Sequence, residues 1–89
     1  MSKQPYTLTE PDKLALVLLS VLKPNYEGIS KTAVFMYFTK EVQDSFDKLE
    51  NDGLISREKR DFIGVFYVIS EDGEEVLREN GIKVVKPVI

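Results

Sequence analysis

The side chains that most enzymes use for catalysis are scarce in this 89-residue chain, which contains neither cysteine nor histidine. The thiol nucleophile and the imidazole acid–base group are therefore missing. Carboxylates, lysines and tyrosines remain, but we find no nucleophile–base pair and no glycine-rich loop of the phosphate-cradling type. We expect a protein that is not an enzyme and that has no cofactor.

Four carboxylates gather close together in the sequence, and their spacing resembles that of a metal site: Glu71, Asp72, Glu74 and Glu75. Ser70 stands directly before them and is a good N-cap for a helix. Negative charge in the first turn of a helix is favoured by the helix dipole. We therefore interpret these residues as helix-capping acids and expect no metal site.

Basic and amide side chains that can contact phosphates or base edges lie in two segments. One set falls in a predicted helix and the other in a predicted hairpin: Lys40, Gln43 and Lys48, then Arg57, Lys59 and Arg60. The alternative interpretation is an ordinary solvated helix face and a hairpin whose charges protect its edge from aggregation. Both interpretations stay open at this point.

Four segments carry helix start and stop signals. Each is expected to begin after a Ser or Thr N-cap, namely Thr9, Ser30, Thr39 and Ser70. The first helix should end at Pro24, the second near Tyr37, the third near Asn51 and the fourth at Asn80–Gly81. In the third helix Val42, Phe46 and Leu49 are spaced i, i+4 and i+7, which predicts one buried stripe.

The hydrophobic period changes after Gly53, where two β-strands are expected. They are Leu54–Lys59 and Val65–Ile69, joined by a loop that contains Arg60, Asp61 and Gly64. The order of elements predicts an α+β fold with a three-helix core, a two-stranded β-hairpin and a C-terminal helix. We expect one domain over residues 1–89, with its core at about 9–81 and terminal extensions at 1–8 and 82–89.

Two phrases within this order resemble the winged-helix family, and most of all its MarR-like and PadR-like transcriptional regulators. Residues 49–57, LENDGLISR, look like the junction between the third helix and the wing in that family. Residues 67–77, YVISEDGEEVL, look like the junction between the second wing strand and the next helix. The resemblance covers roughly Asp12 to Asn80 and implies a DNA-binding transcriptional regulator.

In such proteins the third helix enters the major groove and the wing touches the backbone or the minor groove. Carried over position by position, the resemblance implies DNA contacts from Lys31, Thr32, Thr39, Lys40, Gln43, Lys48, Arg57, Lys59 and Arg60. Asp44 and Asp47 would share the groove-facing surface of the third helix. Double-stranded DNA is the partner that this resemblance implies.

The charge distribution leaves a second hypothesis open. The chain has a net charge of −3, and over residues 31–52 three lysines oppose five carboxylates. A carboxylate that faces phosphate offsets part of the gain from a neighbouring lysine. The alternative function is an acidic winged-helix module that binds a protein and does not bind DNA through its third helix.

The chain has more apolar residues than one small core needs, which favours a homodimer. The first helix is apolar nearly all round, residues 35–38 are all large and apolar, and both faces of the second strand are apolar. We expect the interface with the partner subunit to include Leu16, Leu19, Phe35, Tyr37 and Phe66. The β-prone tail Ile82–Ile89 would pack there or extend the wing sheet.

The location of the protein is expected to be cytoplasmic. No apolar run approaches the ~20 residues that span a bilayer. The first five residues also lack the basic and apolar blocks of a signal peptide. We therefore expect no membrane partner.

Overall fold

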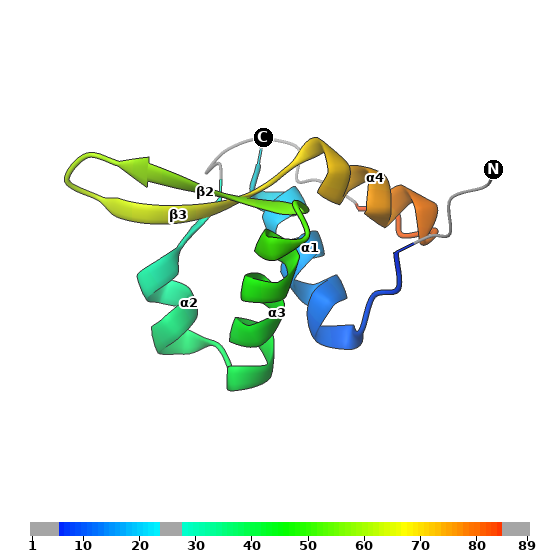
Figure 1. The fold of residues 1–89 in the computed structure, drawn as a ribbon, viewed down its shortest axis with the longest axis horizontal. Helices are drawn as coiled ribbons and strands as arrows, with labels where there is room; N and C mark the ends of the chain where they lie inside the picture. Colours follow the sequence, from blue (N-terminus) through cyan, green and yellow to red (C-terminus); the bar gives the residue numbers. More distant parts are fainter. Residues whose placement is uncertain (1–5, 24–27, 85–89) are drawn as a thin grey trace.

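A computed structural model describes residues 6–23 and 28–84, which form an α+β fold with four helices and a three-stranded antiparallel sheet (Figure 1). In chain order the elements are α1 (Glu10–Leu22), β1 (Ile29–Ser30), α2 (Lys31–Tyr37), α3 (Lys40–Asn51), β2 (Ile55–Arg60), β3 (Gly64–Ile69) and α4 (Glu71–Glu79). The four predicted helices and the two predicted strands are confirmed, but Arg60 and Gly64, predicted in the loop, are the adjoining ends of β2 and β3. Pro24, the predicted end of the first helix, lies outside the described residues.

Side chains just before each helix fix where the helices begin. The hydroxyl of Thr9 accepts a hydrogen bond from the amide of Asp12 at 3.3 Å, and the Asp12 carboxylate accepts from the amide of Thr9 at 3.1 Å. Ser30, Thr39 and Ser70 each accept a hydrogen bond from the backbone amide three residues later. These caps are local, which is why the sequence predicts the helix starts well.

The sheet has a third strand, so the prediction of a two-stranded hairpin was wrong. The hairpin strands β2 and β3 are antiparallel neighbours, with Arg57 opposite Tyr67 and Lys59 opposite Val65. The short strand β1 pairs with the other edge of β3, so that Ser30 lies opposite Phe66, and the order is β1-β3-β2. A strand of two residues is too short to leave an alternating pattern in the sequence.

A close backbone approach at Gly28 brings β1 to the sheet. The φ of Gly28 is 118°, which side chains rarely allow. A Cβ atom at this position would lie 2.0 Å from the carbonyl oxygen of Tyr67. Only glycine lets the chain enter β1 along this path.

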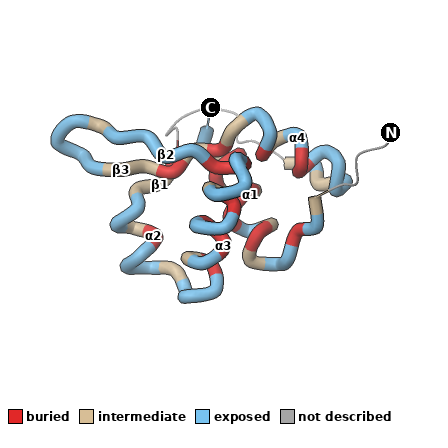
Figure 2. Tube along the Cα trace, in the orientation of Figure 1, coloured by how far each residue is buried: buried red, intermediate tan, exposed pale blue. Residues whose placement is uncertain are grey.

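The core lies where α1, α3 and α4 meet the inner face of the sheet, and the hairpin tip and the outer surface of α2 stay exposed (Figure 2). Val42, Phe46 and Leu49 are all buried, which confirms the predicted stripe of the third helix. The Phe46 ring contacts the Tyr67 ring at 5.1 Å and the Phe38 ring at 6.0 Å, measured between centroids. These ring contacts hold α3 against the sheet.

Helix α1 is central to this core, which corrects part of the predicted dimer interface. Leu16 and Leu19 have no exposed surface because neighbouring elements of the same chain cover them. Their assignment to an interface with a partner subunit was wrong. On the remaining sides of the helix, Val17 is partly buried and Leu14 is 54% exposed.

The terminal extensions are described only in part. Residues 1–5 and 85–89 lie outside the described residues. Ile82 and Val84 pack against the core, but residues 82–84 form no strand, so the described part of the tail does not extend the sheet. None of the helices in the described ranges is long and apolar enough to cross a membrane.

Candidate nucleic-acid interface

The three basic residues of the hairpin do not share one face of the sheet. Successive residues of a strand point to opposite faces, so Arg57 and Lys59, two positions apart, lie on the same face as Tyr67, which packs against α3. Arg60 lies on the opposite face, where its guanidinium is 4.4 Å from the centre of the Phe66 ring. The structure therefore separates Arg60 from the other two cations.

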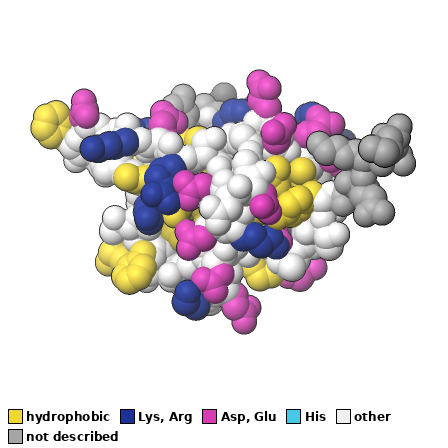
Figure 3. All heavy atoms as spheres, in the orientation of Figure 1, with side chains coloured by type: hydrophobic (Ala, Val, Ile, Leu, Met, Phe, Trp, Pro, Cys, Tyr) yellow, Lys and Arg dark blue, Asp and Glu magenta, His cyan; other side chains and the backbone are white. Residues whose placement is uncertain are grey.

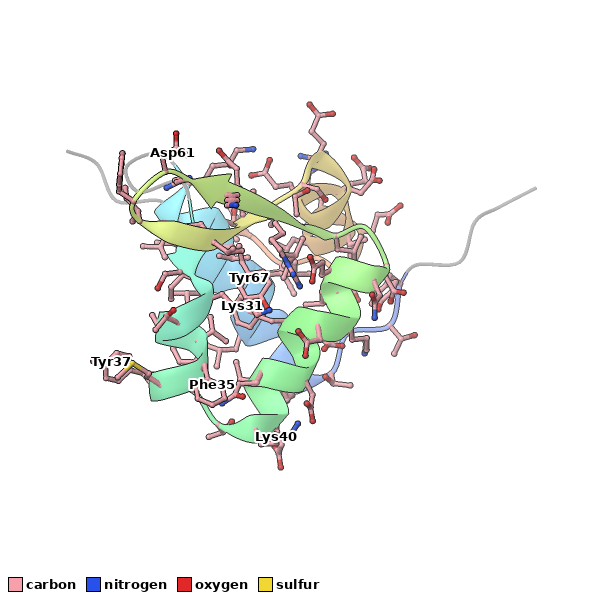
Figure 4. The ribbon with its side chains drawn as sticks, turned by 60° about the vertical axis from the view of Figure 1, so that its left-hand side comes forward. Lys31, Phe35, Tyr37, Lys40, Asp61 and Tyr67 are labelled. Atoms are coloured by element: carbon pink, nitrogen blue, oxygen red, sulfur yellow. The ribbon has the colours of Figure 1, made fainter. Side chains whose placement is uncertain are left out.

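Helix α2 adds a third cation to the face of Arg57 and Lys59. Lys31 is the first residue of α2, and its side chain lies beside Tyr67 (Figure 4). Lys31 and Tyr67 line a shallow hollow of about 100 Å³ together with Phe35, Gln43 and Asp47. We call Lys31, Arg57 and Lys59 the cationic cluster, which occupies the angle between the hairpin and helices α2 and α3. Figure 3 shows dark blue side chains in this angle.

The members of the cationic cluster differ in how far they are paired. Arg57 donates to the carboxylate of Glu50 over 2.8 Å, and this bond raises the pKa of Arg57. Lys31 and Lys59 are exposed, and neither forms an ion pair with another residue in the described part of the chain. The ammonium groups of Lys31 and Lys59 are thus available to an anion from outside the chain. The guanidinium of Arg57 beside them is already paired with Glu50 of α3.

The predicted cations of α3 are both paired within the chain. Lys40 forms an ion pair with Asp44 over 2.8 Å, and the bond raises the pKa of Lys40. Lys48 points toward α1, where its Nζ lies 2.7 Å from the carboxylate of Asp12 and 5.8 Å from the centre of the Tyr6 ring. Lys48 therefore stabilises the fold and does not join the cationic cluster.

The polar side chains at the start of α3 are also used inside the chain. The amide of Gln43 donates to the backbone carbonyls of Phe38 at 2.9 Å and Phe35 at 3.2 Å. These two bonds tie the end of α2 to α3. The hydroxyl of Thr39 caps α3, and Thr32 is exposed on α2. Of the predicted DNA-contacting residues, only the cations of the cationic cluster, Lys31, Arg57 and Lys59, lie on one shared surface.

The Asp12 carboxylate is a buried ionic group that the sequence pattern did not predict. Its burial alone would raise its pKa, but the hydrogen bonds from Lys48 and Thr9 outweigh this effect and lower the pKa. Asp12 and Lys48 are 36 positions apart, so only the folded chain shows that they are partners. This ion pair joins α1 to α3.

Carboxylates of α3 border the cationic cluster. Asp47 accepts a hydrogen bond from the Tyr67 hydroxyl at 3.5 Å, and Glu50 holds Arg57. Burial and the charge of Asp47 raise the pKa of Tyr67, so its hydroxyl stays protonated. Figure 3 shows dark blue side chains below the hairpin, and magenta side chains mixed with further dark blue ones over the helices.

Helix α2 also exposes three large apolar side chains. Phe35, Met36 and Tyr37 are 74%, 62% and 77% exposed, while Phe38 is partly buried against the core. Phe35 points toward α3, and Tyr37 points outward at the end of α2 (Figure 4). Phe66, the remaining predicted interface residue, is partly buried beneath Arg60.

Within residues 6–23 and 28–84 no three carboxylates come close enough to hold a metal ion. The acids of the first turn of α4 instead surround a helix start that Ser70 caps. Comparison of the chain with known protein families, with curated proteins and with solved structures finds no match.

Proposed function

We propose that this chain is a DNA-binding transcriptional regulator with a winged-helix arrangement, in which the β2–β3 hairpin is the wing. The convergence of Lys31, Arg57 and Lys59 in the angle between the hairpin and helices α2 and α3 carries this proposal. Cations on two adjoining elements can contact successive phosphates of one DNA strand. The proposal includes a location inside the cell, in the cytoplasm.

The affinity of such a surface comes mainly from phosphate neutralisation. Lys31 and Lys59 have no intramolecular partner to lose among the described residues, so they gain most from a phosphate. Arg57 has to share its donors between Glu50 and DNA. In this proposal the hairpin and the start of α2 hold the backbone, and α3 approaches the bases through its first turn.

Fluorescence anisotropy with a labelled duplex tests the proposal. Binding should weaken steeply between about 50 and about 200 mM salt, and the double variant Lys31→Gln/Lys59→Gln should bind more weakly. The slope of log affinity against log salt should fall by about 0.9 for each phosphate contact removed. Lys83→Gln, which removes one exposed positive charge after α4, should leave both quantities unchanged. Failure of every duplex to bind at low salt would refute DNA binding.

A second candidate is a module that binds a basic protein surface. The exposed carboxylates of α3 and the apolar side chains of α2 favour it, because together they form a mixed acidic and hydrophobic surface. Asp44→Asn and Asp47→Asn separate the two functions. They should strengthen DNA binding by removing charge repulsion, whereas they should weaken capture of a basic protein partner.

We further propose that the regulator acts as a homodimer through the exposed side of α2. Two copies would read two half-sites, as dimeric helix-turn-helix proteins do. Phe35 and Tyr37 are the exposed residues of the predicted interface, and Leu16 and Leu19 have no part in it. Sedimentation analysis should show a dimer that the Phe35→Ser/Tyr37→Ser variant converts to a monomer.

A further inference from the structure

The turn between β2 and β3 presents an aromatic ring at the far end of the molecule. Phe62 is fully exposed, with a relative accessibility of 108%, and Ile63 beside it is 65% exposed. Figure 1 shows this turn projecting well beyond the helices. Two adjacent apolar side chains at the tip of a hairpin contribute nothing to the core.

The backbone at Phe62 is held in an unfavourable conformation. Its φ is 66°, and it is the only described residue other than glycine with a positive φ. This left-handed region costs an L-residue roughly 1–2 kcal/mol. The amide of Ile63 donates to the carbonyl of Arg60 at 3.3 Å and closes the turn. The turn therefore keeps a costly geometry that leaves the ring in solvent.

Positive charge flanks the ring on both faces of the hairpin. Lys59 lies on the face of the cationic cluster, and Arg60, paired across the sheet with Gly64, lies on the other face. Arg60 covers Phe66 and is 3.8 Å from Glu58, so it stays close to the sheet. In a DNA minor groove the stacked bases lie between the phosphates of the two strands. A hairpin tip with an aromatic ring between two cations could therefore place the ring against the bases and each cation near one strand.

We propose that Phe62 is a wedge that inserts between base pairs from the minor groove and kinks the bound duplex. The inference rests on the proposed DNA-binding function. Apolar side chains inserted in this way unstack a base step and bend DNA by about 20–90°. Pyrimidine–purine steps such as TA unstack most easily, so the wedge selects duplexes that contain them.

One acidic residue opposes this contact. Asp61 lies in the turn directly before Phe62 (Figure 4), and its carboxylate would approach the phosphates. Asp61→Asn should therefore tighten binding to a duplex with a central TA step. This change leaves the hairpin ladder intact, because Asp61 lies outside the paired residues of β2 and β3.

The test uses a duplex with dyes at its two ends and 2-aminopurine at a central TA step. Energy transfer between the dyes reports the kink, and 2-aminopurine fluorescence reports unstacking. The wild-type chain should raise both signals, and Phe62→Ala should lose both, with affinity lower by about tenfold, as expected for one lost aromatic–base stacking contact. Its salt slope should stay that of the wild type. Leu14→Ala, the removal of an exposed apolar side chain on α1 that lies in none of the proposed interfaces, should keep both signals.

Two results would overturn the wedge. If the wild-type chain binds the duplex with a Lys31- and Lys59-dependent salt slope but produces no kink, the wedge is refuted and DNA binding stands. If neither wild type nor variants bind any duplex, both proposals fail. Vesicles of phosphatidylglycerol serve as a counter-test, because Phe62-dependent binding to them without duplex kinking would assign the ring to a lipid surface.

Discussion

Phe46 and Phe62 are the same residue type in opposite surroundings. Phe46 has no exposed surface and lies between rings from the sheet and from the end of α2, whereas Phe62 is fully exposed at the hairpin tip. The first belongs to a body formed by α1, α3, α4 and the base of the sheet. The second belongs to a projecting part formed by α2 and the hairpin. The body contains most of the buried core, and the projecting part presents exposed apolar and charged side chains.

The ionic groups divide in the same way. The body contains Asp12, a fully buried carboxylate held by Lys48 and by its helix cap. The projecting part contains Lys31 and Lys59, which are exposed and have no ion pair in the described part of the chain. A substitution should therefore affect stability or binding according to the part in which it lies.

Removal of the two rings provides the largest test of this contrast. Phe46→Ala should lower the free energy of unfolding by about 3–5 kcal/mol, because it opens a cavity in a closed core. Phe62→Ala should change it by less than about 0.5 kcal/mol, as expected at an exposed site. Urea denaturation followed by circular dichroism measures both. Equal losses in the two variants would contradict the division.

The internal ion pair should have the next largest effect. Asp12→Asn should cost about 1.5–3 kcal/mol at neutral pH, the range for hydrogen bonds to a charged group. The pKa of Asp12 is lowered in the fold, so its carboxylate stabilises the native state above the unfolded pKa of about 3.9. This contribution is lost as the pH falls through the lower folded pKa. The difference in stability between wild type and variant should therefore shrink as the pH falls below the unfolded pKa of about 3.9, and a constant difference would refute the assignment.

Gly73 tests the contact between α4 and the hairpin base. Alanine normally stabilises a helix relative to glycine by about 0.5–1 kcal/mol. Here an added Cβ would lie 2.3 Å from the carbonyl oxygen of Leu54 and 2.8 Å from Cγ1 of Ile69. Gly73→Ala should therefore destabilise the fold by about 1–3 kcal/mol, the usual range for overpacking. A rise in thermal midpoint would show that α4 can move away from the sheet.

The smallest effect on stability is expected in the cationic cluster. Lys31→Gln/Lys59→Gln should change the free energy of unfolding by less than about 0.5 kcal/mol, because both side chains are exposed. The same variant should lose most of the salt-dependent DNA binding. A variant that loses binding only because it unfolds would show a parallel loss of its circular dichroism signal.

Elements whose ends depend on neighbouring residues could be predicted from the sequence. The four caps lie within three residues of the amides that they accept from, so Thr9, Ser30, Thr39 and Ser70 marked their helices correctly. The short strand β1 could not be predicted, because it depends on Gly28 passing close to Tyr67, 39 residues later in the sequence. The ion pair between Asp12 and Lys48 could not be predicted either, because its partners are 36 positions apart in the sequence.

Two features of the candidate site differ from the sequence-based prediction although local spacing alone indicates them. Residues 57 and 60 are three apart in a strand, which places them on opposite faces by simple alternation. Lys40 and Asp44 are four apart on a helix, which is the spacing of an ion pair. In contrast, the position of Lys31 beside Arg57 and Lys59 depends on how α2 meets the sheet, and no local pattern records it.

Ser30 belongs to two elements at once. Its backbone pairs with Phe66 in the sheet, and its hydroxyl caps α2, so no linker separates strand from helix. The shared residue therefore joins α2 directly to the edge of the sheet. Lys31 lies at the start of α2 and Lys59 lies in the hairpin, so this junction sets the distance between their ammonium groups. In the proposed complex with DNA, that distance would set the spacing of the phosphates that the two residues contact.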